Sequence, residues 1–160
     1  MIEKVNPSHP DKVADRIAGA IVDLAYKKEE NPKIAVEVLL GHGFVNLIIE
    51  SSVNISDAEA EAIVSRITKR TDLKASLIMV AQDPILASNQ DKEVRCGDNG
   101  IFKGVPLTDE ERNLSKIAHD IYMKYPTDGK YVLGDNKLII CQSCAKTEEL
   151  RVSYPTAVIN

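Results

Sequence analysis

The chain has 160 residues, of which 44% are hydrophobic and 28% are charged, so it can form one ordinary domain or two small ones with a true core. Its net charge of −4 argues against broad nucleic-acid binding through a basic surface. It has no signal-peptide core and no apolar run near the roughly 20 residues that span a bilayer. We therefore expect a cytoplasmic protein whose partners are neither nucleic acid nor membrane.

The first predicted elements are a helix and a hairpin. Apolar residues recur at intervals of three and four from Pro10 to Lys28, which predicts an amphipathic helix. Two apolar strands follow, Ile34–Leu40 and Phe44–Val53. The three residues Gly41-His42-Gly43 between them are typical of a hairpin connection.

A second helix and another strand come next. Ser56 and Glu59 have the spacing of a capping box, which predicts a helix start. The apolar run Leu73–Val80 is typical of a buried strand. From Ala81 to Gly104 turn-forming residues interrupt every pattern, so we expect a long loop over 81–104, of the kind that forms a functional lid or a connector.

The remainder of the chain predicts one more helix and a hairpin. Thr108 opens a helix that continues to about Tyr125, and the strands Lys137–Ser143 and Leu150–Ile159 form the last hairpin. This order of elements favours an α+β fold, a mainly antiparallel sheet with helices packed on one face. We expect one domain over 1–104 and a partial second domain over 105–160.

The segment Ser8–Asp15 places an imidazole, a carboxylate and an ammonium group at the first turn of the first predicted helix. Backbone N–H groups at a helix start are unpaired and carry the positive end of the helix dipole. His9 and Lys12 therefore suit a phosphate chain, and Asp11 suits its metal ion. A simpler interpretation is also open, in which Ser8 caps the helix and the charged groups are only solvated.

Other polar residues interrupt apolar or turn segments. Glu37 is the only charge in its strand, where a buried carboxylate is costly unless it is paired or binds a cation. Glu50 follows the apolar run Leu47-Ile48-Ile49 in the next strand, and a solvent-facing position would explain either glutamate. Gly97-Asp98-Asn99-Gly100 could let the backbone approach a ligand, but it is also an ordinary turn, as is Gly134-Asp135-Asn136-Lys137.

Taken in order, these motifs resemble the S-adenosylmethionine synthetase (methionine adenosyltransferase) family. The first motif, His9-Pro10-Asp11-Lys12-Val13-Ala14-Asp15, is similar to the family signature Gly-His-Pro-Asp-Lys-(Val/Ile)-Ala-Asp. Glu37 and Glu50 fall where the family has two strand glutamates. Three further motifs resemble the family's Gln-Ser-Pro, Gly-Asp-Gln-Gly and Asp-x-Lys; they are Gln82-Asp83-Pro84, Gly97-Asp98-Asn99-Gly100 and Asp135-Asn136-Lys137.

The resemblance implies a reaction in which the methionine sulfur attacks C5′ of ATP and the intact triphosphate leaves, with Mg²⁺ and K⁺ as cofactors. A leaving group of that charge needs cations around it. The implied roles are triphosphate binding and catalysis for His9 and Lys12, Mg²⁺ binding for Asp11, K⁺ binding for Glu37, methionine binding for Glu50, Gln82 and Asp98, and ATP binding for Asp135 and Lys137.

The sequence departs from the family in places. Asn6-Pro7-Ser8 stands where the family has Ser-Glu-Gly, and Ile48 and Ile49 stand where it usually has two glycines. The sequence ends at Asn160, about where the family's central hairpin ends, so we expect later phosphate-binding segments to be missing. We therefore predict a methionine adenosyltransferase with a synthetase-like fold, whose site is completed by a homodimer mate or by a partner chain that carries the missing domains.

Two other functions stay open from the sequence. The first is a non-catalytic relative that binds ATP or methionine and acts as a regulatory subunit. The second is a metal-dependent phosphohydrolase of nucleotides or polyphosphate, which would use Asp11 and the glutamates without methionine.

Overall fold

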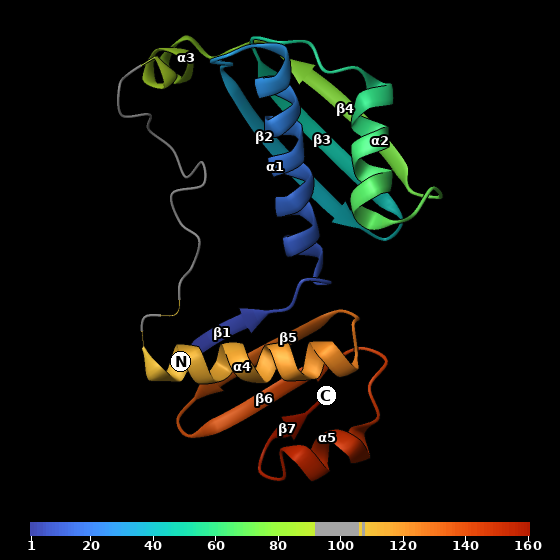
Figure 1. Cartoon of the computed structure of the whole chain (residues 1–160), viewed down its shortest axis with the longest axis vertical. Coiled ribbons are helices and arrows are strands. Elements are labelled where there is room, and N and C mark those ends of the chain that lie inside the picture. Colours follow the sequence, from blue (N-terminus) through green and yellow to red (C-terminus); the bar gives the residue numbers. More distant parts are fainter. Residues whose placement is uncertain (92–105, 107) are drawn as a thin grey trace. The chain divides into compact units, whose positions relative to one another are not determined.

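The computed structural model describes residues 1–91, 106 and 108–160, and this part of the chain divides into two compact units (Figure 1). One unit comprises Met1–Lys12 and the described residues of Lys103–Asn160, and the other comprises the described residues of Val13–Phe102. Each unit has its own sheet and its own hydrophobic core, so the α+β prediction is confirmed. The division into domains 1–104 and 105–160 stays a prediction.

The unit of Val13–Phe102 is a three-stranded sheet with two long helices on one face (Figure 1). Its strand order is β2-β3-β4, with β2 antiparallel and β4 parallel to β3. Its elements in chain order are α1 (Pro10–Lys28, whose first residues belong to the other unit), β2 (Ile34–Gly41), β3 (Phe44–Ser51), α2 (Asp57–Thr68), β4 (Lys74–Val80) and α3 (Pro84–Gln90).

The core of this unit lies between α1, α2 and the inner face of the sheet. Ile17, Ile21 and Ala25 are fully buried and are spaced four residues apart, so they form one stripe along α1. Alternate residues of β3 meet this stripe, namely Val45, Leu47 and Ile49. Burial of each large aliphatic side chain contributes about 1.5–3 kcal/mol to the stability of this packing. The predicted helix Pro10–Lys28 is confirmed at both ends.

The connection between β2 and β3 is shorter than predicted. Gly41 pairs with Phe44, so the loop has two residues, His42 and Gly43, rather than three. Both have positive φ, 50° and 85°, which is the geometry of a type I′ turn. This turn matches the twist of the strands and fixes the register in which Glu37 lies opposite Ile48.

Strand β4 was predicted to be buried, and this was wrong. Among the described residues β4 pairs only with β3, so it is an edge strand. Ile78 on its outward face is 52% exposed, and Met79 and Val80 are exposed as well. The apolar side chains at the end of β4 are therefore exposed rather than packed in a core.

The other unit is a four-stranded sheet of order β1-β5-β6-β7 with α4 packed against it. Its elements are β1 (Ile2–Val5), α4 (Asp109–Lys124), β5 (Gly129–Gly134), β6 (Lys137–Gln142), α5 (Thr147–Ser153) and β7 (Val158–Ile159). Leu114, Ala118 and Ile121 of α4 pack on Tyr131 and Ile140 of the sheet. The helix predicted from Thr108 to about Tyr125 is confirmed, including its capping box.

The predicted last hairpin was wrong in its partner. Strand β6 pairs with β5 through the two-residue turn Asp135–Asn136, and not with the segment Leu150–Ile159. Leu150 lies in α5, which connects β6 to the short strand β7. Because β7 runs parallel to β6, a hairpin turn cannot join them and a crossover is required.

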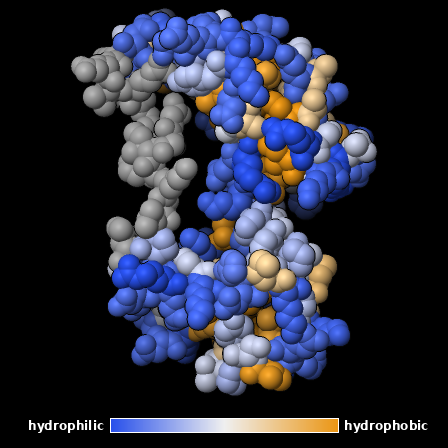
Figure 2. All heavy atoms as spheres, in the orientation of Figure 1, coloured by the Kyte–Doolittle hydropathy of each residue, from blue (hydrophilic) through white to orange (hydrophobic). Residues whose placement is uncertain are grey.

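The strand pairings make both sheets mixed. The pairs β1–β5, β2–β3 and β5–β6 are antiparallel, and β3–β4 and β6–β7 are parallel. No helix in the described part of the chain is long and apolar enough to cross a membrane. Hydrophilic residues cover most of the surface visible in Figure 2, and hydrophobic residues show between them in each unit.

Glu149 on α5 gives the unit of β1, β5, β6 and β7 a pH-dependent contact. Its carboxylate pairs with Lys124 at 2.6 Å and accepts a hydrogen bond from the Tyr125 hydroxyl, and these groups lower its pKa to about 2. Because the folded pKa lies below the ordinary value of 4.5, this contribution to stability is present above pH 4.5 and is lost as the pH falls toward 2.

We therefore expect Glu149→Gln to lower the melting temperature modestly at pH 7, and the difference from wild type to shrink as the pH approaches 2.5. Thermal unfolding followed by circular dichroism checks this. Glu148→Gln, its exposed neighbour on α5, is the matched control and should change little at either pH. An equal effect of Glu149→Gln at both pH values would contradict the assignment.

Candidate functional site

The segment before α1 is held in a defined turn that presents His9. The backbone N–H of Asp11 donates to His9 Nδ1 at 3.3 Å, so the residue next to the helix caps it. The Ser8 hydroxyl instead donates to the carbonyl of Pro126 at 3.3 Å, so the interpretation of Ser8 as the cap was wrong. With Nδ1 acting as an acceptor, the neutral imidazole carries its proton on Nε2, where it can donate to a ligand.

Asp11 and Lys12 lie in the first turn of α1 and are exposed. The Asp11 side chain is 82% exposed, and its Oδ2 lies 3.8 Å from His9 Nδ1. Mg²⁺ usually binds through one or two carboxylates together with substrate phosphates. Among the described residues no group of three or more His, Cys, Asp or Glu side chains could hold a metal alone. Asp11 offers one exposed carboxylate of this kind.

Glu37 and Glu50 lie on the same outward face of the β2–β3–β4 sheet. Glu37 pairs with Ile48, and Glu50 is two residues further along β3, so the glutamates are diagonal neighbours, with Cβ atoms on the order of 7 Å apart. Glu37 is exposed, which removes the burial cost expected for a charge in an apolar strand. Two like charges on one face favour a cation or a ligand ammonium group near them.

The segment Gln82-Asp83 is held at the end of this sheet by two hydrogen bonds. The Glu50 carboxylate accepts the backbone N–H of Asp83 at 2.8 Å, and Gln82 Nε2 donates to the carbonyl of Lys33 at 3.2 Å. Asp83 then caps α3, with Pro84 at its first turn. The predicted loop over 81–104 therefore begins with a helix, for which Asp83-Pro84 was the missed signal.

Asp135 and Lys137 do not lie beside the His9 segment of their own unit. Asp135 and Lys137 flank the tip of the β5–β6 hairpin, whereas Asn6, which precedes the His9 segment, bonds to Gly129 at the other end of β5. The six residues of β5 therefore separate the two places by on the order of 17 Å. Asp98 lies outside the described residues.

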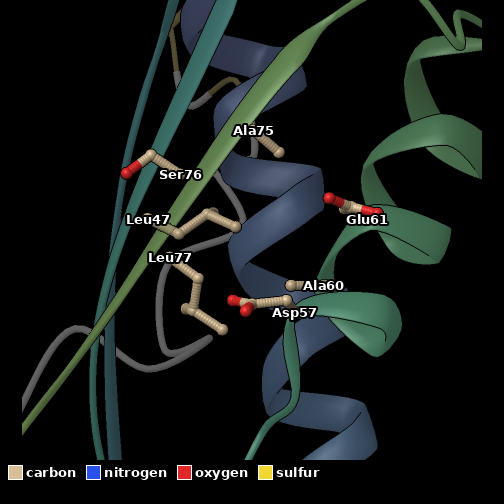
Figure 3. A pocket seen from close by; sticks show the side chains of 7 residues that line it. All are labelled: Leu47, Asp57, Ala60, Glu61, Ala75, Ser76 and Leu77. Atoms are coloured by element: carbon tan, nitrogen blue, oxygen red, sulfur yellow. The ribbon is translucent and has the colours of Figure 1, made fainter.

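A cavity of about 300 Å³ opens between α2 and β4 (Figure 3). Leu47 and Leu77 point into it from the strands, and Asp57 and Glu61 line it from the helix, while Ser76 points to the other side of the sheet. The glutamates Glu37 and Glu50 share the side of Ser76, because alternate strand residues face alternate sides. The cavity therefore opens on the opposite side of the sheet from Glu37 and Glu50.

A comparison with protein families identifies the family of this chain. The family model described as "S-adenosylmethionine synthetase, N-terminal domain" matches residues 1–91. The chain belongs to this family. The matched residues include the His9 segment at the start of α1, both sheet glutamates and Gln82, so the predicted family resemblance is confirmed over residues 1–91.

Curated S-adenosylmethionine synthases are similar over most of the chain. The synthase of Zymomonas mobilis is 28% identical over 152 residues, which cover 76% of this chain and 38% of that protein. The synthase of Helicobacter pylori strain Shi470 is 25% identical over 132 residues, which cover 73% of this chain and 34% of that protein. The chain thus spans little more than a third of the length of these relatives.

A solved structure shows the same fold. It is described as an unusual S-adenosylmethionine synthetase from Campylobacter jejuni, and it matches with a TM-score of 0.60 at 16% identity. The match covers 99% of this chain and 57% of that chain, so both units take part in the fold likeness to the S-adenosylmethionine synthetase family.

In this family member the structure also reveals a pair that sequence reasoning missed. Asp128-Gly129-Lys130 has the same Asp-x-Lys spacing as Asp135-Asn136-Lys137, but it enters β5 at the end beside Asn6. Lys130 pairs with Val5 in the sheet and forms an ion pair with Glu3 at 3.0 Å. The repeated spacing was visible in the sequence, and only the unpredicted strands β1 and β5 show which copy lies near the His9 segment.

The Gln90 side chain links α3 to the edge of β2 by two hydrogen bonds. Its side-chain amide accepts from the Ile34 N–H at 2.9 Å and donates to the Ile34 carbonyl at 3.0 Å, as a neighbouring strand would. We expect Gln90→Leu to leave both backbone groups without these partners, at a cost of about 1–3 kcal/mol for each buried group. Hydrogen exchange should therefore accelerate in α3 and at Ile34.

Mass spectrometry of peptides that cover 30–40 and 80–91 measures this exchange. Ser88→Ala, an exposed change on the same helix, is the control and should keep the wild-type rates. Unchanged exchange in Gln90→Leu would show that other contacts hold α3.

Proposed function

We propose that this chain is the ATP-binding and methionine-binding part of a methionine adenosyltransferase, which forms S-adenosylmethionine from ATP and methionine. The observation that carries the proposal is the start of α1. There His9 Nε2, the Lys12 ammonium and the exposed Asp11 carboxylate stand at a helix N-terminus, in a chain of the S-adenosylmethionine synthetase family. The reaction class rests on the family, and the assignment of roles rests on this geometry.

The residues proposed to bind phosphate lie at the start of α1 and in its first turn. The His9 Nε2–H donates to a phosphate oxygen and Lys12 supplies a positive charge, while the helix dipole adds to both. Asp11 would hold Mg²⁺ bound to the triphosphate, and this ion would neutralise charge on the leaving group. Lys130 and Asp128 are nearer to this turn along β5 than Asp135 and Lys137, so we add them as candidate ATP contacts.

The residues proposed to bind methionine lie at the outward end of the β2–β3–β4 sheet. The Glu50 carboxylate, which accepts the N–H of Asp83, would also accept hydrogen bonds from the methionine ammonium group, and Gln82, the residue before Asp83, is the second proposed methionine contact. Glu37 would offer an oxygen to K⁺, which suits a hard cation. The methionine sulfur forms the new bond to C5′, the C5′–O bond breaks, and the triphosphate leaves with the electron pair, so no general base is required and positioning supplies the rate.

A second copy of the chain is the partner that best completes this site. The outward face of the β2–β3–β4 sheet carries exposed hydrophobic side chains around Glu37 and Glu50; they are Leu39, Phe44, Ile48, Ile78 and Val80. Exposed hydrophobic side chains gathered on one sheet face mark an interaction surface. Pairing two such faces in a homodimer would bring groups of the partner subunit to both glutamates; a partner chain with further domains is the other way to cover them.

Product formation tests the proposal directly. The purified chain is incubated with ATP, methionine, Mg²⁺ and K⁺, and S-adenosylmethionine is measured by mass spectrometry beside an Asp11→Asn control. Product from the wild type alone supports a site completed by copies of this chain. Release of phosphate without S-adenosylmethionine would instead favour the phosphohydrolase alternative, and ATP binding without either product would favour a binding subunit.

A further inference from the structure

A buried polar cluster lies between β1, β5 and β6. Asn6 is 1% exposed, and its Nδ2 donates to the Thr127 carbonyl at 2.8 Å, to Tyr131 Oη at 3.2 Å and to Gln142 Oε1 at 3.4 Å. Tyr131, which is fully buried, donates its hydroxyl to Gln142 Oε1. A cluster of this kind is costly to bury unless it is satisfied, and once satisfied it fixes one geometry.

Gln142 and Gly129 complete the cluster. Gln142 Nε2 is directed at the carbonyls of the segment before β5, with Thr127 O and Asp128 O both at 3.1 Å. A Cβ atom at Gly129 would lie 2.3–2.5 Å from Gln142 Oε1, Asn6 Nδ2 and Tyr131 Oη. Only glycine therefore lets the three side chains meet over the start of β5.

The same asparagine also holds the turn that leads into α1. Asn6 Oδ1 accepts the backbone N–H of Ser8 at 3.0 Å, and its carbonyl accepts the N–H of His9 at 3.1 Å. Its own N–H donates to the Gly129 carbonyl at 2.9 Å. Every polar group of Asn6 is thus used, on one side to the sheet and on the other side to the residues that present His9.

We propose that Asn6 is a positioning residue for the His9-Pro10-Asp11-Lys12 segment, and that Tyr131 and Gln142 hold it in place. The proposal rests on the proposed function for its consequence in ATP binding, but the positioning itself concerns the ligand-free chain. The contacts couple residues far apart in the sequence, so the C-terminal part of the chain sets the geometry of the N-terminal motif. None of the three side chains needs to touch ATP.

The consequence for ligand binding follows from the rigidity of the turn. A displacement of about 1 Å in a binding group can cost on the order of a hundredfold in a well-organised site. Asn6→Ala removes all the side-chain contacts of the turn to the sheet, so we expect ATP affinity to fall at least tenfold. Tyr131→Phe keeps the Asn6 contact to Thr127 and removes one hydroxyl, so we expect a smaller loss in the same direction.

Two measurements test positioning apart from folding. ATP affinity is measured by calorimetry below the melting transition of every variant. The imidazole resonances of His9 and the amide resonance of Asp11 are measured by NMR without ligand. Ile140→Val is the matched control, because Ile140 is fully buried on β6 in the same core and its side chain offers no hydrogen bond to the cluster. It should lower the melting temperature but leave ATP affinity within about twofold and both resonances in place.

We expect Asn6→Ala and Tyr131→Phe to shift the His9 and Asp11 resonances. If Asn6→Ala does not fold, Tyr131→Phe carries the test. Unmoved resonances in a folded variant would overturn the positioning role. If the resonances move but the wild type does not bind ATP, the positioning role stands and the proposed function fails.

Discussion

Asp11→Asn is expected to lower the affinity for ATP in the presence of Mg²⁺ by at least about tenfold, or 1.4 kcal/mol, while the fold stays intact. The Asp11 side chain is 82% exposed and lies 3.8 Å from His9 Nδ1, so the substitution removes little from the folded state. An amide oxygen is a weaker ligand than a carboxylate for a hard divalent cation. The loss of a negative charge in the first turn costs the helix only about 0.3–1 kcal/mol.

The dependence on metal separates this prediction from a general loss of binding. Without Mg²⁺ the carboxylate of Asp11 repels a phosphate chain, so the variant should then bind ATP as well as the wild type or better. Calorimetric titrations with and without Mg²⁺ measure both values. Asp23→Asn, the same change at an exposed position further along α1, is the control and should match the wild type. Equal Mg²⁺-dependent affinity in Asp11→Asn and wild type would remove Asp11 from the metal site.

The helices were predictable because their signals are local. The stripe of Ile17, Ile21 and Ala25 repeats every four residues, and two capping boxes stand directly before α2 and α4. Each signal concerns residues that touch within one or two turns, so no knowledge of the rest of the chain is needed.

The strands were harder because their partners are remote. β1 has four residues and β5 has six, which is too short for alternation to stand out. The apolar sequence of Leu73–Val80 predicts a buried strand, yet no other described element packs on its outward face, where Ile78 and Val80 are exposed. Hydrophobicity alone does not distinguish a core strand from a strand with an exposed apolar face.

The candidate site shows the same division between local and remote information. The motif from His9 to Lys12 is contiguous, so the sequence displays it in full. The residues that fix its geometry lie 121–136 positions away from Asn6, at Thr127, Tyr131 and Gln142. Nothing in the sequence indicates that Asn6 makes these remote contacts. In the sequence Asn6 is only a departure from the family's serine. The choice between the two Asp-x-Lys segments depended on the same unpredicted strands.

Ile48→Lys is expected to convert a dimer of this chain to a monomer. Ile48 lies at the centre of the outward face of the β2–β3–β4 sheet, between Glu37 of β2 and Ile78 of β4 in the pairing register. Burial of an ammonium group in the apolar interface costs several kcal/mol, so the dissociation constant should rise at least about a hundredfold. In the monomer the new lysine is tolerated, because Ile48 is exposed and Glu37 lies directly opposite as its ion-pair partner.

The molar mass in solution, measured by light scattering over a range of concentrations, checks this prediction. Ile85→Lys is the matched control, since Ile85 is exposed on α3 of the same unit and is not part of the sheet face; it should keep the wild-type mass. If dimerisation completes the site, S-adenosylmethionine formation by Ile48→Lys should fall in proportion to the fraction of dimer lost. Added wild-type chain should not restore the activity of the variant chains. A wild-type chain that is monomeric at all concentrations, or an Ile48→Lys variant that keeps the dimer mass, would show that this face belongs to a different partner.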